Sequence, residues 1–250
     1  MERDQRSRDT IGKFFIAGAS VANLTAAMRN PLLVFALFAF ASASARAESW
    51  SIGGGIGPFI FGRFVERTVT IRNETSSATT SSRLSAETRP GVEADIERDL
   101  TRHLAIRLEA TWVRSPLRIK ARTGDQGTTI DAGHLNLTTF VVPLVIRFNP
   151  NGALRFHVMG GPAYAFYNAH ALSSDGSALR IFAGTRARWG GAGAVGVAWW
   201  WRSHFAVEWQ AQEILTSSPF RVEDFAPVSQ GIHIPKPRNG HTTVGIRYRF

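Results

Sequence analysis

The chain has 250 residues, with 29 Lys and Arg against 19 Asp and Glu and a formal net charge of +10 at pH 7. This length suits one domain, and the lack of cysteine excludes a disulfide framework, a thiol nucleophile and a cysteine-ligated metal site. The basic residues are scattered singly among apolar ones, whereas nucleic-acid binding proteins cluster them. We therefore expect no nucleic-acid partner.

An apolar run without charge, residues 31–45, lies near the start of the chain and leads into Ala45-Arg46-Ala47, a small-x-small sequence. This layout predicts a secretory signal peptide over residues 1–47 and an exported domain over residues 48–250. The apolar core of the run is about 10 residues, too short for a bilayer-spanning helix, which needs roughly 20. Met28 is an alternative start, because the segment that follows it is a compact signal by itself.

Alternation of apolar and polar residues predicts eight strands in the exported domain. Their expected ranges, in chain order, are 49–64, 90–98, 104–113, 136–148, 154–166, 189–199, 205–212 and 242–250. The first strand is rich in glycine, which in a barrel strand permits bending and close packing. No stretch shows a sustained helical apolar pattern, so the predicted fold class is all-β.

The connections between these strands alternate in length. Short turns follow the second, fourth and sixth strands, at residues 98–102, 149–153 and 201–204. Long polar segments follow the first, third, fifth and seventh strands, at roughly 65–89, 115–134, 167–187 and 213–239. Tight turns at one end and long loops at the other are typical of an up-and-down barrel across a membrane. We therefore expect an eight-stranded antiparallel transmembrane β-barrel.

Alternation alone does not say which face of the strands meets which medium, because a secreted lipocalin-like carrier would turn the apolar face inward. Two features favour the membrane orientation. Charges of both signs share the polar faces and can pair inside a narrow barrel, whereas one Arg facing lipid costs about 2–4 kcal/mol. Aromatic residues also gather at the strand ends, as they do at membrane interfaces. The expected interior residues are Arg107, Glu109, Glu208, Arg247 and Arg249, in an ion-pair network that leaves no wide pore.

The last strand alternates Thr242, Val244, Ile246, Tyr248 and Phe250 with polar or small residues. A final strand that ends in Phe, with Tyr two residues before it, resembles the C-terminal strand of Gram-negative outer-membrane β-barrels. The resemblance implies that the barrel-insertion machinery reads Tyr248 and Phe250.

Three further segments, 138–148, 160–164 and 204–210, are similar to the fourth, fifth and seventh strands of eight-stranded outer-membrane barrels of the OmpA/OmpX-like kind. The resemblance covers nearly all of the exported domain. It implies location in the cell outer membrane, contact with outer-membrane lipid and lipopolysaccharide, and a monomer. The family is functionally diverse, so the resemblance specifies location better than activity.

Candidate chemistry is sparse. The histidines are scattered without metal-ligand spacing, so we expect neither a metal nor another cofactor. A lipid-deacylating barrel family of similar size uses a His and a Ser near its C-terminal strands, but the corresponding strand here, 207–212, has neither. His241 and Thr242 are adjacent, and neighbours on a strand point to opposite faces. We expect no catalysis; a lipid A-modifying enzyme and the soluble carrier are the alternatives.

One expected loop is strongly basic. Arg114, Arg118, Lys120 and Arg122 lie in or beside the segment after the third strand. A basic outer loop can hold anionic lipopolysaccharide or a host polyanion. The competing interpretation is a solvated loop without a ligand. We expect an outer-membrane barrel with a structural or surface-interaction role.

Overall fold

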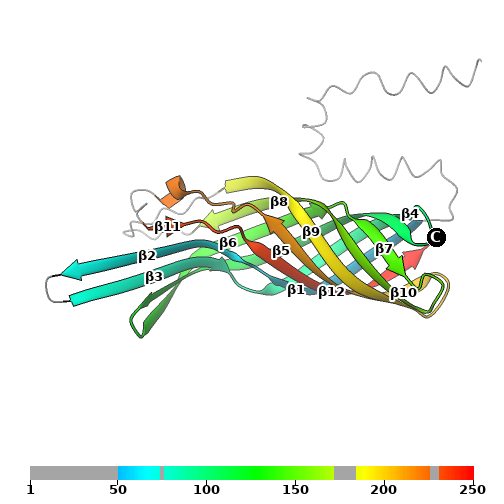
Figure 1. Ribbon diagram of the computed structural model, residues 1–250, viewed down its shortest axis with the longest axis horizontal. Coiled ribbons are helices and arrows are strands. Elements are labelled where there is room, and N and C mark those ends of the chain that lie inside the picture. The colour runs from blue at the N-terminus through cyan, green and yellow to red at the C-terminus, as the bar shows by residue number, and fades with distance from the viewer. Residues whose placement is uncertain (1–49, 74–75, 172–183, 226–230) are drawn as a thin grey trace, which may run out of the picture. The chain divides into compact units, whose positions relative to one another are not determined.

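The computed structural model describes residues 50–73, 76–171, 184–225 and 231–250 (Figure 1). The predicted signal peptide, residues 1–47, and the alternative start at Met28 lie outside these ranges. Strands dominate the described residues, together with a short 3-10 helix, η2 (Val222–Phe225). None of the helical structure in these ranges is long and apolar enough to cross a membrane.

Eight strand positions close into one antiparallel barrel. In order around the wall they are β1 (Trp50–Ile60), β4 (Arg89–Asp99), β5 (Leu104–Thr123), β6 (Gln126–Val141) with β7 (Leu144–Phe148), β8 (Leu154–Ala171), β9 (Gly184–Trp200), β10 (Phe205–Thr216) and β12 (Arg238–Arg249). The pairing of β12 with β1 closes the ring, so the wall has no open edge. The predicted all-β, eight-stranded up-and-down barrel is confirmed.

The expected fourth strand is interrupted at residues 142–143, so β6 and β7 share one position in the wall. Pro143 has no N–H to give to the ladder. Its carbonyl still accepts a hydrogen bond from Arg107 N (3.1 Å), and Val142 N donates to the Pro162 carbonyl (3.1 Å). The wall is therefore continuous across the interruption.

Glycines allow the seam between β1 and β12 to close. A Cβ added at Gly57 would collide with the carbonyl of Thr242, and one added at Gly245 would collide with the carbonyl oxygen of Gly54. Any larger residue would force the two backbones apart. The close packing expected of the glycine-rich first strand is confirmed.

The prediction of loops at 65–89 and 115–134 was wrong. The first segment forms most of the hairpin β2 (Arg63–Asn73) and β3 (Ser76–Ala86), and the second continues β5 and β6. Because β3 pairs with β5, and β11 (Ile232–His233) pairs with β2, a sheet extends beyond the closed wall (Figure 1). We call β11, β2, β3 and the parts of β5 and β6 from residue 114 to residue 134 the outer sheet.

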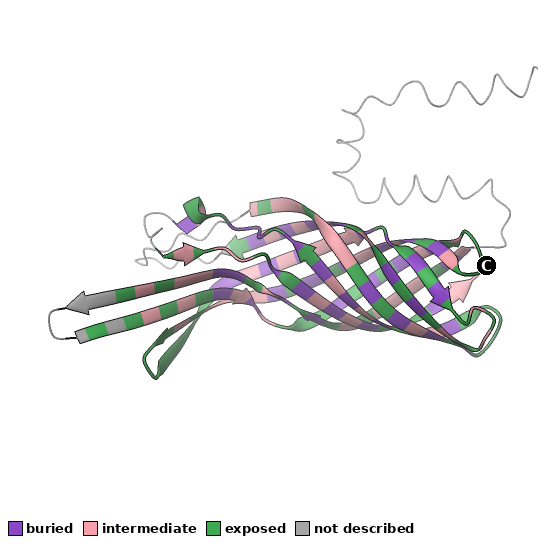
Figure 2. Cartoon of the chain, in the orientation of Figure 1, coloured by how far each residue is buried: buried purple, intermediate pink, exposed green. Residues whose placement is uncertain are grey.

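Burial alternates along the strands of the closed wall (Figure 2). On β5, Ile106 and Trp112 are exposed on the outside, while Arg107 and Glu109 are buried inside; on β12, Ile246 is 66% exposed. An apolar outside around a polar inside is the arrangement of a membrane barrel and the reverse of a soluble carrier. In outer-membrane barrels the short turns face the periplasm and the long connections face the cell exterior, and we name the two ends of this barrel by that rule.

The polarity of the two faces of β5 reverses just beyond Trp112, although the same alternate residues continue to point inward. Val113 and Leu117 lie inside and are fully buried, whereas Arg114 and Lys120 lie outside and are exposed. An apolar inside with a polar outside is typical of a sheet that meets water. The exchange therefore marks the outer boundary of the lipid-facing band on this strand.

Candidate functional site

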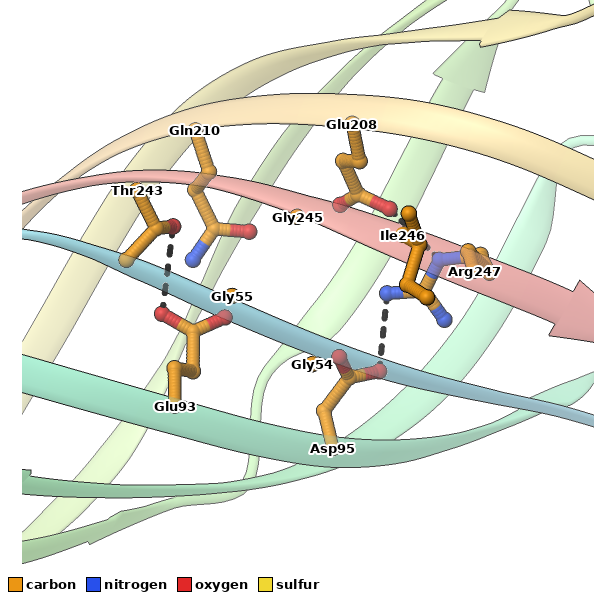
Figure 3. Close-up of a pocket in the computed structure, with 10 residues that line it drawn as sticks. All are labelled: Gly54, Gly55, Glu93, Asp95, Glu208, Gln210, Thr243, Gly245, Ile246 and Arg247. Atoms are coloured by element: carbon orange, nitrogen blue, oxygen red, sulfur yellow. Dashed lines mark hydrogen bonds and ion pairs between the residues drawn. The ribbon is translucent and has the colours of Figure 1, made fainter.

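The periplasmic half of the barrel interior holds an ion-pair network. Arg107 pairs with Glu97 (2.7 Å) and with Glu208 (2.9 Å). Arg247 pairs with Asp95 (2.7 Å) and with the other oxygen of Glu208 (2.5 Å), as Figure 3 shows in part. All five side chains are buried. Burying charges is tolerated when each has a partner with good geometry.

A layer of amides, hydroxyls and carboxylates lies beside this network, towards the outer sheet. Gln210 and Gln212 donate hydrogen bonds to the two oxygens of Glu109 (3.1 and 2.6 Å). The Thr243 hydroxyl donates to Glu93 (3.3 Å; Figure 3). Two cavities in this half have volumes of about 10 and 20 Å³, each with room for about one water molecule. The inward side chains of the described residues therefore fill most of the periplasmic half.

Arg249, expected in the interior, lies at the periplasmic mouth instead. Its side chain is 25% exposed and pairs with Asp99 (2.8 Å). Its guanidinium also lies 5.0 Å from the ring centre of Trp200, which Arg155 approaches at 4.6 Å. Cation–π contacts of this kind hold the ring of Trp200 in place.

The half of the interior towards the outer sheet is apolar. Its buried members include Phe59, Phe64, Val113, Leu117, Leu135, Leu137, Tyr167, Ile214, Phe220 and Phe225. Phe64 meets both Tyr167 and Phe220 edge to face, with ring centroids 6.1 and 5.6 Å apart. Sequence analysis expected ion pairs throughout the interior and missed this core. The available signal was the pair of apolar inward residues Val113 and Leu117 on β5.

A cap segment, residues 217–225, is fixed to the barrel wall by two arginines of β9. Arg186 forms a two-point ion pair with Asp224, in which Nη2 to Oδ1 measures 2.7 Å. Arg188 donates to the carbonyl of Ser218 (2.9 Å). The aromatic side chains of the cap thereby join the apolar core.

The predicted basic residues, Arg114, Arg118, Lys120 and Arg122, all lie on β5, in a strand instead of a loop. They share the outward face, beyond Trp112. Because alternate residues of a strand point the same way, four cations at even positions form one row. Their surroundings divide the row into two parts.

In the lower part of the row, each arginine has a neighbour. Arg118 pairs with Glu87 and Asp131, both at 2.9 Å, and its hydrogen bond lowers the pKa of the Glu87 carboxyl. Arg114 lies 3.4 Å from the ring of His134. Desolvation by burial, followed by the charge of Arg114, lowers the pKa of His134.

In the upper part, Lys120 and Arg122 line an open groove of about 590 Å³ in the outer sheet. Arg63 and Arg67 of β2 and Arg83 of β3 also line it. Sequence analysis missed these three, because only the pairing of β3 with β5 brings the two segments together. No group of three or more His, Asp or Glu in the described ranges is placed to hold a metal ion.

Comparison with known proteins gives the fold its context. No protein-family model matches the chain, and no curated protein matches it. Similar solved structures include the outer membrane protein OprG from Pseudomonas aeruginosa, at 12% identity and a TM-score of 0.54, covering 82% of this chain and 97% of that chain. Others are Neisserial surface protein A (11% identity, TM-score 0.42, 80% and 97% coverage) and Ail of Yersinia pestis (10%, 0.39, 82% and 100%). The similarity to OprG shows that this chain has the outer-membrane β-barrel fold, and its lipid-facing apolar wall is that of an integral outer-membrane protein.

Proposed function

We propose that the protein is a closed, non-catalytic outer-membrane barrel that serves as a structural element and presents the outer sheet for interactions at the cell surface. The filled interior is the observation that carries this proposal. The cavities along the periplasmic half have volumes of about 10 and 20 Å³, room for about one water each. Beyond them lies the apolar core. An interior filled in this way offers no path for solutes.

The surroundings of His241, one of two buried histidines, support a role without catalysis. His241 is almost completely buried, and its Nδ1 lies 3.4 Å from Glu93. The hydroxyl of Thr243 donates to Glu93 and not to the histidine. A nucleophile and its base must contact each other and must also reach a substrate. The Thr243 hydroxyl does not contact His241, and the burial of His241 keeps it from a substrate. Both observations argue against the lipid A-modifying alternative.

The proposed partners are outer-membrane lipid, lipopolysaccharide and the barrel-insertion machinery. Phe250 is 52% exposed, its backbone N donates to the Trp50 carbonyl (3.0 Å), and its ring meets Tyr248 edge to face. The final aromatic pair is therefore held in place yet open to contact. The closed wall leaves no strand edge in the lipid-facing band, which supports a monomer there, and the exposed edge of β2 lies in the outer sheet.

Planar-bilayer recording on the purified, refolded protein tests the closed barrel. We expect no conductance steps under conditions in which a known porin gives them, because the interior is filled. Regular steps from the wild-type protein would contradict the proposal. Mass spectra of lipid A from cells with and without the protein test the absence of catalysis, and a protein-dependent mass change would overturn it.

A further inference from the structure

Cationic side chains concentrate on one face of the groove in the outer sheet. The strand register places Arg83 of β3 opposite Lys120 of β5. One step along the same face, Arg122 of β5 lies opposite Ser81 of β3. Directly opposite residues in paired strands have Cβ atoms about 4.5–5.5 Å apart, and diagonal neighbours are about 7–8 Å apart. Arg83, Lys120 and Arg122 therefore form one compact cationic patch.

Acidic neighbours only partly neutralise this patch: Glu66 of β2 lies opposite Arg83 in the register, but its carboxylate accepts a hydrogen bond from Arg63 (2.6 Å). Neither Arg83 nor Lys120 forms an ion pair with any residue in the described part of the chain. Arg122 has only Asp125, at 3.8 Å, and that carboxylate is fully exposed. Like charges directly opposite each other destabilise a pair of strands. A bound anion would remove this repulsion, whereas Arg118, nearer the membrane, already has two acidic partners.

The remaining lining indicates the chemistry of the ligand. Hydroxyls of Thr68, Ser81 and Thr129 lie among the cations, and the one acidic lining residue, Glu66, accepts a hydrogen bond from Arg63 (2.6 Å). No aromatic or large aliphatic side chain of the described residues lines the groove, so it offers no platform for bases or apolar groups. Guanidinium groups bind sulfate and phosphate oxygens well, and hydroxyls bind sugar hydroxyls.

We infer that the groove binds an anionic oligosaccharide, with Arg83, Lys120 and Arg122 contacting its sulfate or phosphate groups. The inference rests on the proposed surface-interaction role and gives that role a ligand class. The groove lies on the outward face beyond Trp112. Phosphorylated core sugars of neighbouring lipopolysaccharide and free sulfated glycans from outside the cell share this chemistry, and both can reach it.

Calorimetry on the barrel in nanodiscs of uncharged lipid separates these sources. One probe is a heparin-derived hexasaccharide, and the other is phosphorylated lipopolysaccharide core freed of lipid A. The test variant combines Arg83→Gln with Lys120→Gln. The matched control combines Arg89→Gln with Arg118→Gln, which removes the same charge from residues already paired with Glu87. A boiling-dependent shift in gel mobility shows that each variant is folded.

We expect binding that weakens when NaCl is raised from about 50 to about 500 mM. The test variant should lose at least about tenfold in affinity, and the control should stay within about twofold. Tighter binding of the hexasaccharide or of the core identifies the source. Absence of binding by either probe, or equal loss in both variants, would overturn the inference. Conductance in planar bilayers would overturn the closed-barrel function without changing these results.

Discussion

The two halves of the barrel interior are filled by opposite chemistry. The periplasmic half holds carboxylates and guanidinium groups centred on Arg107 and Arg247. The half towards the outer sheet holds aromatic and aliphatic side chains around Phe64 and Leu117. Buried side chains fill both halves, so the difference does not correspond to an open and a blocked part of a channel.

The medium outside the wall explains the difference. Where the outside of the strand meets lipid, apolar residues occupy it and alternation sends the polar residues inward. Where the outside meets water, the same alternation sends the apolar residues inward, as in a soluble protein. Strand β5 shows both patterns. Its inward side chains change from polar to apolar between Trp112 and Val113. The change from a polar to an apolar interior therefore marks the position where the lipid band ends.

The largest effect should come from breaking the charged half. Arg107→Met leaves Glu97 and Glu208 buried without one of their cationic partners, and such losses cost about 3–5 kcal/mol. Urea unfolding in phospholipid vesicles measures the change. Arg249→Met, at the exposed mouth, is the control and should lose much less. Equal losses would show that burial inside the network has no special role.

The apolar half should respond to a cavity instead of a charge. Leu117 is fully buried, so Leu117→Ala should reduce the free energy of unfolding by about 2–5 kcal/mol. Lys120→Ala lies on the opposite face of the same strand and should have little effect in the same assay. If the two variants were equally stable, the upper interior would not be a packed core.

The seam that runs along both halves should be sensitive to a single methyl group. Gly57→Ala places a Cβ against the backbone of Thr242, and overpacking of this kind costs about 1–3 kcal/mol. Gly127→Ala is the matched control, because a Cβ added there would lie 4.0 Å from the nearest atom, the carbonyl oxygen of Ala121. The fraction of protein that keeps its folded mobility in unboiled gels, measured against temperature, reports the difference. Identical melting of both variants would contradict the tight seam.

The smallest effect on stability should come from the last residue. The side chain of Phe250 is half exposed at the wall, so Phe250→Ala should refold in detergent almost as well as the wild type. Assembly in cells should fall, because we expect the insertion machinery to read this residue. Folded and unfolded forms in membrane fractions measure the yield. Normal assembly together with poor refolding would reverse this expectation.

Much of the wall could be predicted from the sequence, because its alternation is strong. Residues 104–112 carry apolar side chains at even positions, with Arg107, Glu109 and Thr111 between them, which is a local signal of a strand with two different faces. Val113 and Leu117 also gave a local signal of the apolar interior. To use it, one must recognise that the inward face of one strand changes from polar to apolar. A rule that applies one orientation to a whole strand cannot find it.

The outer sheet and its groove could not be predicted in the same way. The hairpin β2–β3 is rich in Thr, Ser and Arg, so it shows no clear apolar face, and such a segment is easily taken for a loop. The patch of Arg83, Lys120 and Arg122 depends on which strands pair and in which register. Both are long-range properties that a single sequence does not display.

Single-cysteine labelling along β5 tests the central claim most directly, and the chain has no native cysteine to interfere. Intact cells carrying Ile106→Cys, Ala110→Cys, Arg114→Cys or Arg122→Cys would be treated with a membrane-impermeant maleimide, with denatured protein as the control for complete labelling. The account predicts that positions 106 and 110 are protected by lipid and that positions 114 and 122 react. Reaction at 106 and 110, or protection at 114 and 122, would contradict a lipid boundary at Trp112.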